Sequence, residues 1–166
     1  NLSITQGRHL EIINNKIQLF PDKLWKKELK LFDKTRLNFI EWVVSKENFL
    51  KNPMCKKNGY KIINQHLKKN NLNCRSIDLD FIVKESPLNF SEKQLSALIK
   101  KIEIIIINCE KIGVKYLIFP FLENSSPKGK KKLSKLIYFL NLIEKKISKK
   151  LVLLVETDLT PNKVCL

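Results

Sequence analysis

The sequence predicts an α/β fold in which parallel strands alternate with helices, and three observations lead to this fold class. Apolar runs of strand length recur along the 166 residues, the segments between them carry apolar residues at helical spacing, and carboxylates follow several of the runs. Strands joined through helices are expected to lie parallel, with right-handed crossovers. With 43% hydrophobic residues the chain can bury one core, so a single domain spanning residues 1–166 is expected.

The first units are marked by short signals. Leu2–Ile4 is predicted to be a strand that ends in a polar turn, where Gly7 permits a tight backbone. Asp22 is expected to cap a helix whose apolar stripe begins at Trp25. The apolar run Leu37–Val44 predicts the second strand.

The middle of the chain repeats the same alternation. Gly59–Lys69 predicts a helix and Leu72–Leu79 the third strand. Ser91–Gln94 forms a capping box, so a helix is expected to begin there and to continue to Gly113, which suits a helix C-terminus. Val114–Phe119 predicts the fourth strand.

The last unit contains the longest unbroken aliphatic strand signal. A helix is predicted over Lys130–Lys149, followed by the strand Leu151–Asp158, whose apolar run is typical of a strand buried on both faces. Glu156 is then expected at the C-terminal end of this strand, partly desolvated, where β/α proteins keep their chemistry. Thr160-Pro161 predicts the start of another helix.

These units predict part of a larger barrel. A closed (β/α)8 barrel needs about 250 residues, so the 166 residues are expected to be its first five βα units, cut after the fifth strand. The alternative is a complete, doubly wound open sheet of five strands. No Gly-rich phosphate loop follows the first strand, so neither a dinucleotide site nor a P-loop is indicated.

Charge and cysteine content limit the classes of partner and metal that the chain is expected to bind. The net charge is +16, but only three of the 32 basic residues are Arg, which is the side chain favoured for phosphate and base recognition. We therefore expect solvated lysine-rich faces rather than a nucleic-acid site, with Lys128–Lys135 the best local candidate for a polyanion. The four cysteines form no Cys-x-x-Cys pair, and neither a signal peptide nor a membrane span is visible. A cytoplasmic protein without zinc or membrane contact is expected.

Several short segments resemble one family in order and spacing. They are Gln6-Gly7-Arg8, Lys16-Ile17-Gln18, Phe20-Pro21, Phe39-Ile40-Glu41-Trp42, Asn52-Pro53, and residues 118–126 and 155–159. Together they are similar to the sugar phosphate isomerase/epimerase family of xylose isomerase-like TIM barrels, over the first five eighths of its barrel. The resemblance implies one divalent metal ion (Mn, Mg or Co) and proton transfer next to the carbonyl of a sugar or sugar phosphate.

The resemblance also assigns a role to Glu156. In the family, a glutamate ending the fifth strand is a metal ligand and, in epimerases, an acid/base group; Glu156 matches that position. The other ligands (an Asp, a His and a second Glu) come from later strands outside this chain. The histidines that family members with two or three metal ions carry on the third and fourth strands are lacking here, with Asp78 and Pro120 nearby instead, which argues against multi-zinc endonuclease chemistry.

The residues themselves support further candidates. A carboxylate closing an apolar strand is stabilised by a cation or a hydrogen-bonded partner, so Glu156 fits either a metal ligand or a structural ion pair with a lysine. Glu41, Asp80 and Glu123 are expected at the same end of the sheet and could bind sugar hydroxyls or serve as caps and loop residues. Arg8 could bind a substrate carboxylate or phosphate, or form a salt bridge across the barrel end.

The sequence thus predicts a divalent-metal-dependent sugar or sugar-phosphate isomerase or epimerase. As a fragment, the 166 residues are expected to be inactive without the later strands. Two alternatives stay open: an abasic-site endonuclease-like barrel, favoured by charge, and a noncatalytic partial barrel that associates with a partner through its exposed sheet edges. A homo-oligomer is also left open.

Overall fold

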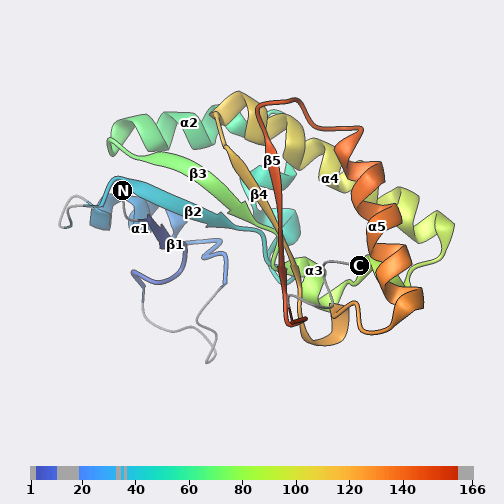
Figure 1. Ribbon diagram of the computed structural model, residues 1–166. Helices are drawn as coiled ribbons and strands as arrows, with labels where there is room; N and C mark the ends of the chain where they lie inside the picture. The colour runs from blue at the N-terminus through green and yellow to red at the C-terminus, as the bar shows by residue number, and fades with distance from the viewer. Residues whose placement is uncertain (1–2, 11–18, 33–34, 36, 161–166) are drawn as a thin grey trace.

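Five parallel strands form one sheet in the computed structural model, which describes residues 3–10, 19–32, 35 and 37–160. The strands are listed here in chain order: β1 (Ser3–Thr5), β2 (Phe39–Val43), β3 (Asn73–Asp78), β4 (Tyr116–Phe121) and β5 (Val152–Thr157). Every neighbouring pair is parallel, and the order across the sheet is β1-β2-β3-β4-β5 (Figure 1).

This consecutive order distinguishes the two predicted architectures. A doubly wound sheet reverses its strand order at a switch point and carries helices on both faces. Here each strand follows its predecessor across the sheet, and α2, α4 and α5 form an arc around one side (Figure 1). When every crossover is right-handed and each strand is added on the same side, all helices lie on one face of the sheet. The other face then corresponds to the interior of a barrel. The predicted α/β partial barrel is confirmed.

Five α-helices join the strands in the part of the chain that the structure describes. They are α1 (Trp25–Leu31), α2 (Tyr60–Lys69), α3 (Phe81–Lys84), α4 (Glu92–Ile112) and α5 (Lys130–Glu144). The predicted capping box at Ser91 is present, since its Oγ accepts the Gln94 N–H and the Gln94 side chain accepts the Ser91 N–H. Gly113 ends α4 with φ +88°, as expected for a left-handed C-terminus. Among the described residues, no helix is long and apolar enough to cross a membrane.

Some predicted boundaries are wrong for local reasons. Asp22 does not cap α1, because its carboxylate bonds to Lys51 Nζ at 2.8 Å and a turn at Pro21 delays the helix until Trp25. α5 ends at Glu144, five residues early, where i→i+3 hydrogen bonds replace the helical pattern in a lysine-rich stretch. β4 continues through Pro120, which is tolerated because the pairing with β3 has already ended.

Two predictions lie outside the described residues. These are the match at Lys16-Ile17-Gln18 and the helix expected to begin at Thr160-Pro161. The short helix α3 and the 3₁₀ turns Phe49–Lys51, Pro53–Cys55, Pro87–Asn89 and Glu123–Ser125 were not predicted, because their segments lack a helical period.

The strand β5 corrects a larger expectation. Its apolar run was predicted to be buried on both faces, yet β5 is an edge strand and Val152, Leu154 and Val155 are about two-fifths exposed. The apolar pattern indicates a strand but does not report its place in the sheet. Among the described residues β5 is the last strand of the sheet on that side.

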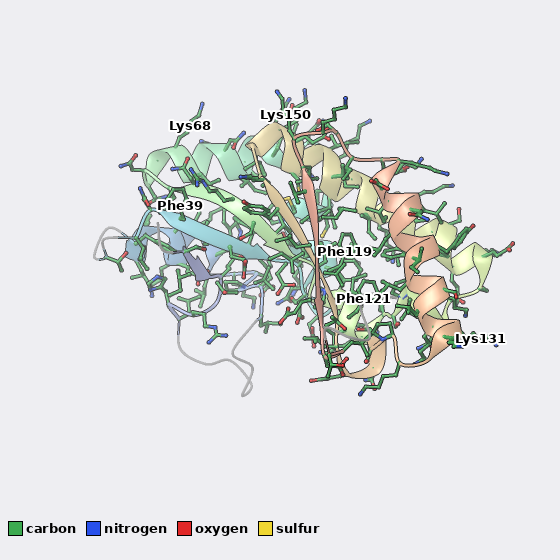
Figure 2. The ribbon with its side chains drawn as sticks, in the orientation of Figure 1. Phe39, Lys68, Phe119, Phe121, Lys131 and Lys150 are labelled. Atoms are coloured by element: carbon green, nitrogen blue, oxygen red, sulfur yellow. The ribbon has the colours of Figure 1, made fainter. Side chains whose placement is uncertain are left out.

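The core lies between the sheet and the helices. Alternate strand residues such as Ile40, Ile77 and Leu117 point to the helical side and are fully buried. On β4, Phe119 and Phe121 pack edge-on against Phe139 of α5, with ring centroids 5.6 and 6.0 Å apart, on the side of the sheet facing that helix (Figure 2). The opposite face of the strands carries polar side chains such as Glu41 and Ser76 among apolar ones such as Val43.

Asn52 anchors the loop after β2. Its buried side chain accepts hydrogen bonds from Trp42 Nε1 and the Met54 N–H, both at 3.0 Å, and donates to the Val43 carbonyl at 2.9 Å. These hydrogen bonds fix the loop against the C-terminal end of β2.

We expect Asn52→Ala to lower the free energy of unfolding by at least about 3 kcal/mol, because it strands two buried donors and one acceptor. Asn64→Ala is the matched control, since the Asn64 side chain makes one exposed hydrogen bond to the Lys111 carbonyl. Urea denaturation of both variants measures the difference; equal losses would contradict the role given to Asn52.

Candidate functional site

The inner face of the sheet, opposite the helices, carries the candidate site. In the register of the sheet, one row across this face contains Thr5, Glu41, Ser76, Tyr116 and Val152. None of these five side chains is buried, whereas their chain neighbours on the helical face are mostly buried. Alternation along each strand thus separates an apolar outer face from an inner face that mixes polar side chains with apolar ones such as Val43 and Ile118.

Glu41 links three strands on this face. Its Oε1 accepts a hydrogen bond from Thr5 Oγ1 of β1 at 3.1 Å, and its Oε2 accepts one from Ser76 Oγ of β3 at 2.8 Å. The register shifts after Ile40, so that Ser76 rather than Arg75 stands opposite Glu41. Both oxygens of a half-buried carboxylate are satisfied in this way.

Asp78 lies one row nearer the C-terminal ends of the strands and is the most buried acid of the group. It ends β3, is 6% exposed and pairs in register with Val43 and Ile118. Burial is the main cause that raises its pKa to about 8, and the negative charges of Asp80, Glu41 and Glu156 raise it further. Four carboxyl groups from three strands and a loop are therefore close enough to interact electrostatically.

Glu156 lies one row further, on β5, opposite Pro120 of β4. The structure corrects its expected environment: the side chain is exposed at the sheet edge instead of being partly desolvated. The strand end is held nearby, because Asp158 accepts a hydrogen bond from Ser126 Oγ at 2.5 Å and pairs with Lys128 Nζ at 3.1 Å. Glu156 is thus an accessible carboxylate on a tethered strand.

The other predicted site residues, Asp80, Arg8 and Glu123, lie outside the strands. Asp80 is half-buried just before α3, in the N-cap position but without a side-chain capping bond. Arg8 is exposed in the turn after β1, and Glu123 is exposed after β4 with φ +48°. The charge of Glu123 is not among the causes that raise the pKa of Asp78. The structure therefore brings Glu41, Asp80 and Glu156 around Asp78 and leaves Glu123 apart.

Asp78 and Glu28 were not predicted to be site residues. For Asp78 the sequence does contain an indication. Polar residues occupy every second position at the end of the third apolar run, at Ser76, Asp78 and Asp80, which is the spacing of one face of a strand. Glu28 had none, because it lies among Lys26, Lys27 and Lys30 and looks like part of a solvated helix face. The fold instead turns Glu28 inward from α1 and buries it completely.

Glu28 holds the loop that follows β1. Its Oε1 accepts the Gly7 N–H at 2.5 Å, and the backbone of His9 also bonds to the carboxylate. Gly7 is required there, since φ is +92° and an added Cβ would lie 2.8 Å from the Leu19 carbonyl oxygen. The imidazole of His9 packs on Phe32 with ring centroids 4.5 Å apart. Burial raises the pKa of Glu28 to about 7.

The described residues do not by themselves complete a metal site. No three His, Cys, Asp or Glu side chains in the described part of the chain are placed to hold one ion. Both oxygens of Glu41 already accept hydrogen bonds, and Asp78 favours its protonated form. Glu156 is accessible and could contribute one oxygen ligand, the type that hard divalent cations prefer.

Fold and site together define a β/α barrel segment with the carboxylates of Asp78 and Glu156 near the C-terminal ends of β3 and β5. Its fold is similar to that of a xylose isomerase domain protein from Alicyclobacillus acidocaldarius subsp. acidocaldarius, with a TM-score of 0.57 at 11% sequence identity. The match covers 92% of this chain and 48% of that protein, so this chain spans about half its length. No protein-family model and no curated protein sequence matches the chain.

The burial of Glu28 predicts a pH-dependent stability. Its folded pKa of about 7 exceeds the ordinary 4.5, so its contribution is fully present below about pH 4.5 and is lost as pH rises through 7. Between pH 4.5 and 8 the wild type should lose about 3 kcal/mol that Glu28→Gln does not lose. Urea denaturation at several pH values measures this difference.

Glu92→Gln is the control, because Glu92 is an exposed acid on α4. Its stability curve should run parallel to that of the wild type. Parallel curves for Glu28→Gln as well would contradict the buried, proton-holding state of Glu28.

Proposed function

We propose that this chain supplies the first five strands of a sugar or sugar-phosphate isomerase or epimerase that uses one divalent metal ion. The observation that carries the proposal is that Glu41, Asp80 and Glu156 interact electrostatically with Asp78, which ends β3, in a xylose isomerase-like sheet. Acids at this edge are suited to binding polyols and to moving protons next to a carbonyl.

Glu156 is proposed as the ligand and base. It is the accessible carboxylate of the group, on a strand whose end is fixed by Asp158. In this role it would accept the proton from the carbon next to the sugar carbonyl and, in an isomerase, return it to the neighbouring carbon; in an epimerase a second acid would donate a proton to the opposite face. A bound divalent ion (Mn, Mg or Co) would supply polarisation of the carbonyl, with its remaining ligands outside the described residues.

The surrounding residues are proposed to bind the substrate. Glu41 is held in one orientation by Thr5 and Ser76, so it presents a fixed acceptor surface to sugar hydroxyls. Asp80 and Glu123 are further candidates for hydroxyl contacts. Arg8, exposed after β1, suits a phosphate group on the sugar.

Solvent exchange tests the proposal on the protein at its natural length. Ketoses and ketose phosphates are incubated with the protein and Mn²⁺ or Mg²⁺ in D₂O, and deuterium entry next to the carbonyl is followed by NMR. Glu156→Gln should slow exchange at least about 100-fold and weaken Mn²⁺ binding in calorimetry. Glu144→Gln, at the far end of α5, should leave both unchanged.

Two results would reject the proposal. One is wild-type protein that binds Mn²⁺ yet exchanges no ketose proton. The other is Glu156→Gln protein that exchanges at the wild-type rate.

A further inference from the structure

The outward faces of α1 and α2 carry lysines and no acid. These exposed lysines form the α1–α2 lysine face: Lys23, Lys26, Lys27 and Lys30 on α1 and the turn before it, and Lys61, Lys68 and Lys69 on α2. The side chain of Lys68, for example, points away from the sheet (Figure 2). Within residues 23–32 the only acid is Glu28, which is buried, and residues 60–69 contain none. The inward position of Glu28 therefore leaves this face without a negative charge.

The two helices present their lysines together. Trp25 of α1 packs edge-on against His66 of α2, with ring centroids 5.0 Å apart, so the helices are in contact. Burial is the main cause that lowers the pKa of His66, and the positive charges of Lys26, Lys69 and Lys30 lower it further. Lysines from both helices are therefore close enough to act on one imidazole.

The lysines of α4 are balanced by acids, and those of the α1–α2 lysine face are not. On α4, Glu92, Glu103 and Glu110 are interspersed with the lysines, and Glu103 pairs with Lys146 at 2.7 Å. No ion pair between described residues includes a lysine of the α1–α2 lysine face. Gathered like charges repel one another unless a counterpart binds, so the face is suited to a polyanion.

The side chains of the face distinguish between kinds of polyanion. Residues 19–32 and 60–69 contain no Arg, the residue suited to forked contacts with phosphates and bases. Trp25 is 6% exposed, so its ring is not available for stacking on bases. Lysines alone are sufficient for attraction to an anionic bilayer, where many lipid headgroups act on each charge. Ile62, 36% exposed on α2, adds apolar contact of the kind that interfacial helices use.

The face lies apart from the candidate site. α1 follows β1 and α2 follows β2 on the helical side of the sheet, which remains the outer side when a β/α barrel closes. Glu41 and Asp78 lie on the opposite, inner side. A membrane in contact with α1 and α2 would therefore leave the C-terminal ends of the strands accessible.

We propose that the α1–α2 lysine face binds the surface of membranes rich in anionic phospholipids. The binding is peripheral and electrostatic, since lysine ammonium groups contact the headgroups, and it weakens as salt screens the charges. The contact was not predicted from the sequence, because only the fold brings residues 23–30 and 61–69 together. It does not depend on the proposed sugar chemistry.

Co-sedimentation with vesicles tests the proposal on the protein at its natural length. Vesicles of phosphatidylcholine with about one third phosphatidylglycerol should bind the wild type, and vesicles of phosphatidylcholine alone should not. Lys26→Glu combined with Lys30→Glu should weaken binding at least about tenfold, because each lysine near the surface contributes about fivefold to the affinity. Lys26→Arg combined with Lys30→Arg keeps both charges and should bind within about twofold of the wild type.

A matched pair on α4 controls for net charge. Lys93→Glu combined with Lys100→Glu makes the same change in charge at exposed positions away from the face. Because salt screens charges that lie far from the bilayer, this variant should lose no more than about twofold in affinity. Circular dichroism confirms that each variant is folded.

Three results would overturn the proposal. They are a wild type that does not bind the anionic vesicles, a folded Lys26→Glu, Lys30→Glu protein that binds them normally, and an α4 variant that loses as much affinity as the α1 variant. Duplex DNA at the same salt concentration is the comparison for other polyanions. A wild type that binds the duplex but not the vesicles would assign the face to nucleic acid instead.

Discussion

The two hydrogen bonds on the Glu41 carboxylate determine how the first three strands are arranged on their inner face. Thr5 and Ser76 donate to its two oxygens, so β1, β2 and β3 are connected through one side chain as well as through backbone pairing. Ser76 reaches Glu41 because the register shifts by one residue after Ile40. Without that shift every later residue of β3 would change faces, and Asp78 would turn toward the helices. The arrangement of the acidic site depends on this single irregularity.

The acidic residues carry a cost in stability. Asp78 and Glu28 are both buried enough to raise their pKa values into the range of neutral pH. Each would be easier to bury as an uncharged side chain. Clusters of this kind gather at functional sites, where raised pKa values provide groups that hold or release a proton near pH 7. Glu28 acts at a distance by holding the loop at Gly7, and the strand carboxylates face the inner surface directly.

Local patterns in the sequence carried enough information to predict the architecture but not the environment of its strands. The capping box at Ser91 and the glycine at position 113 are local signals, and the structure confirms both. β5 is different, because the same apolar run fits a central strand and an edge strand, and only the other strands decide between them. Glu156 is exposed because β5 lies at the edge of the sheet. Glu28 could not be predicted, since its burial depends on a loop contact across 21 residues of sequence.

The central claim is that carboxylates from separate strands share one electrostatic site around Asp78. Carbon-detected NMR titration of the Asp78 carboxyl group tests it most directly. We expect a midpoint near pH 8 that moves toward lower pH in Glu41→Gln, where one neighbouring negative charge is removed. A midpoint near the ordinary value of 3.8, or one unchanged by Glu41→Gln, would contradict it.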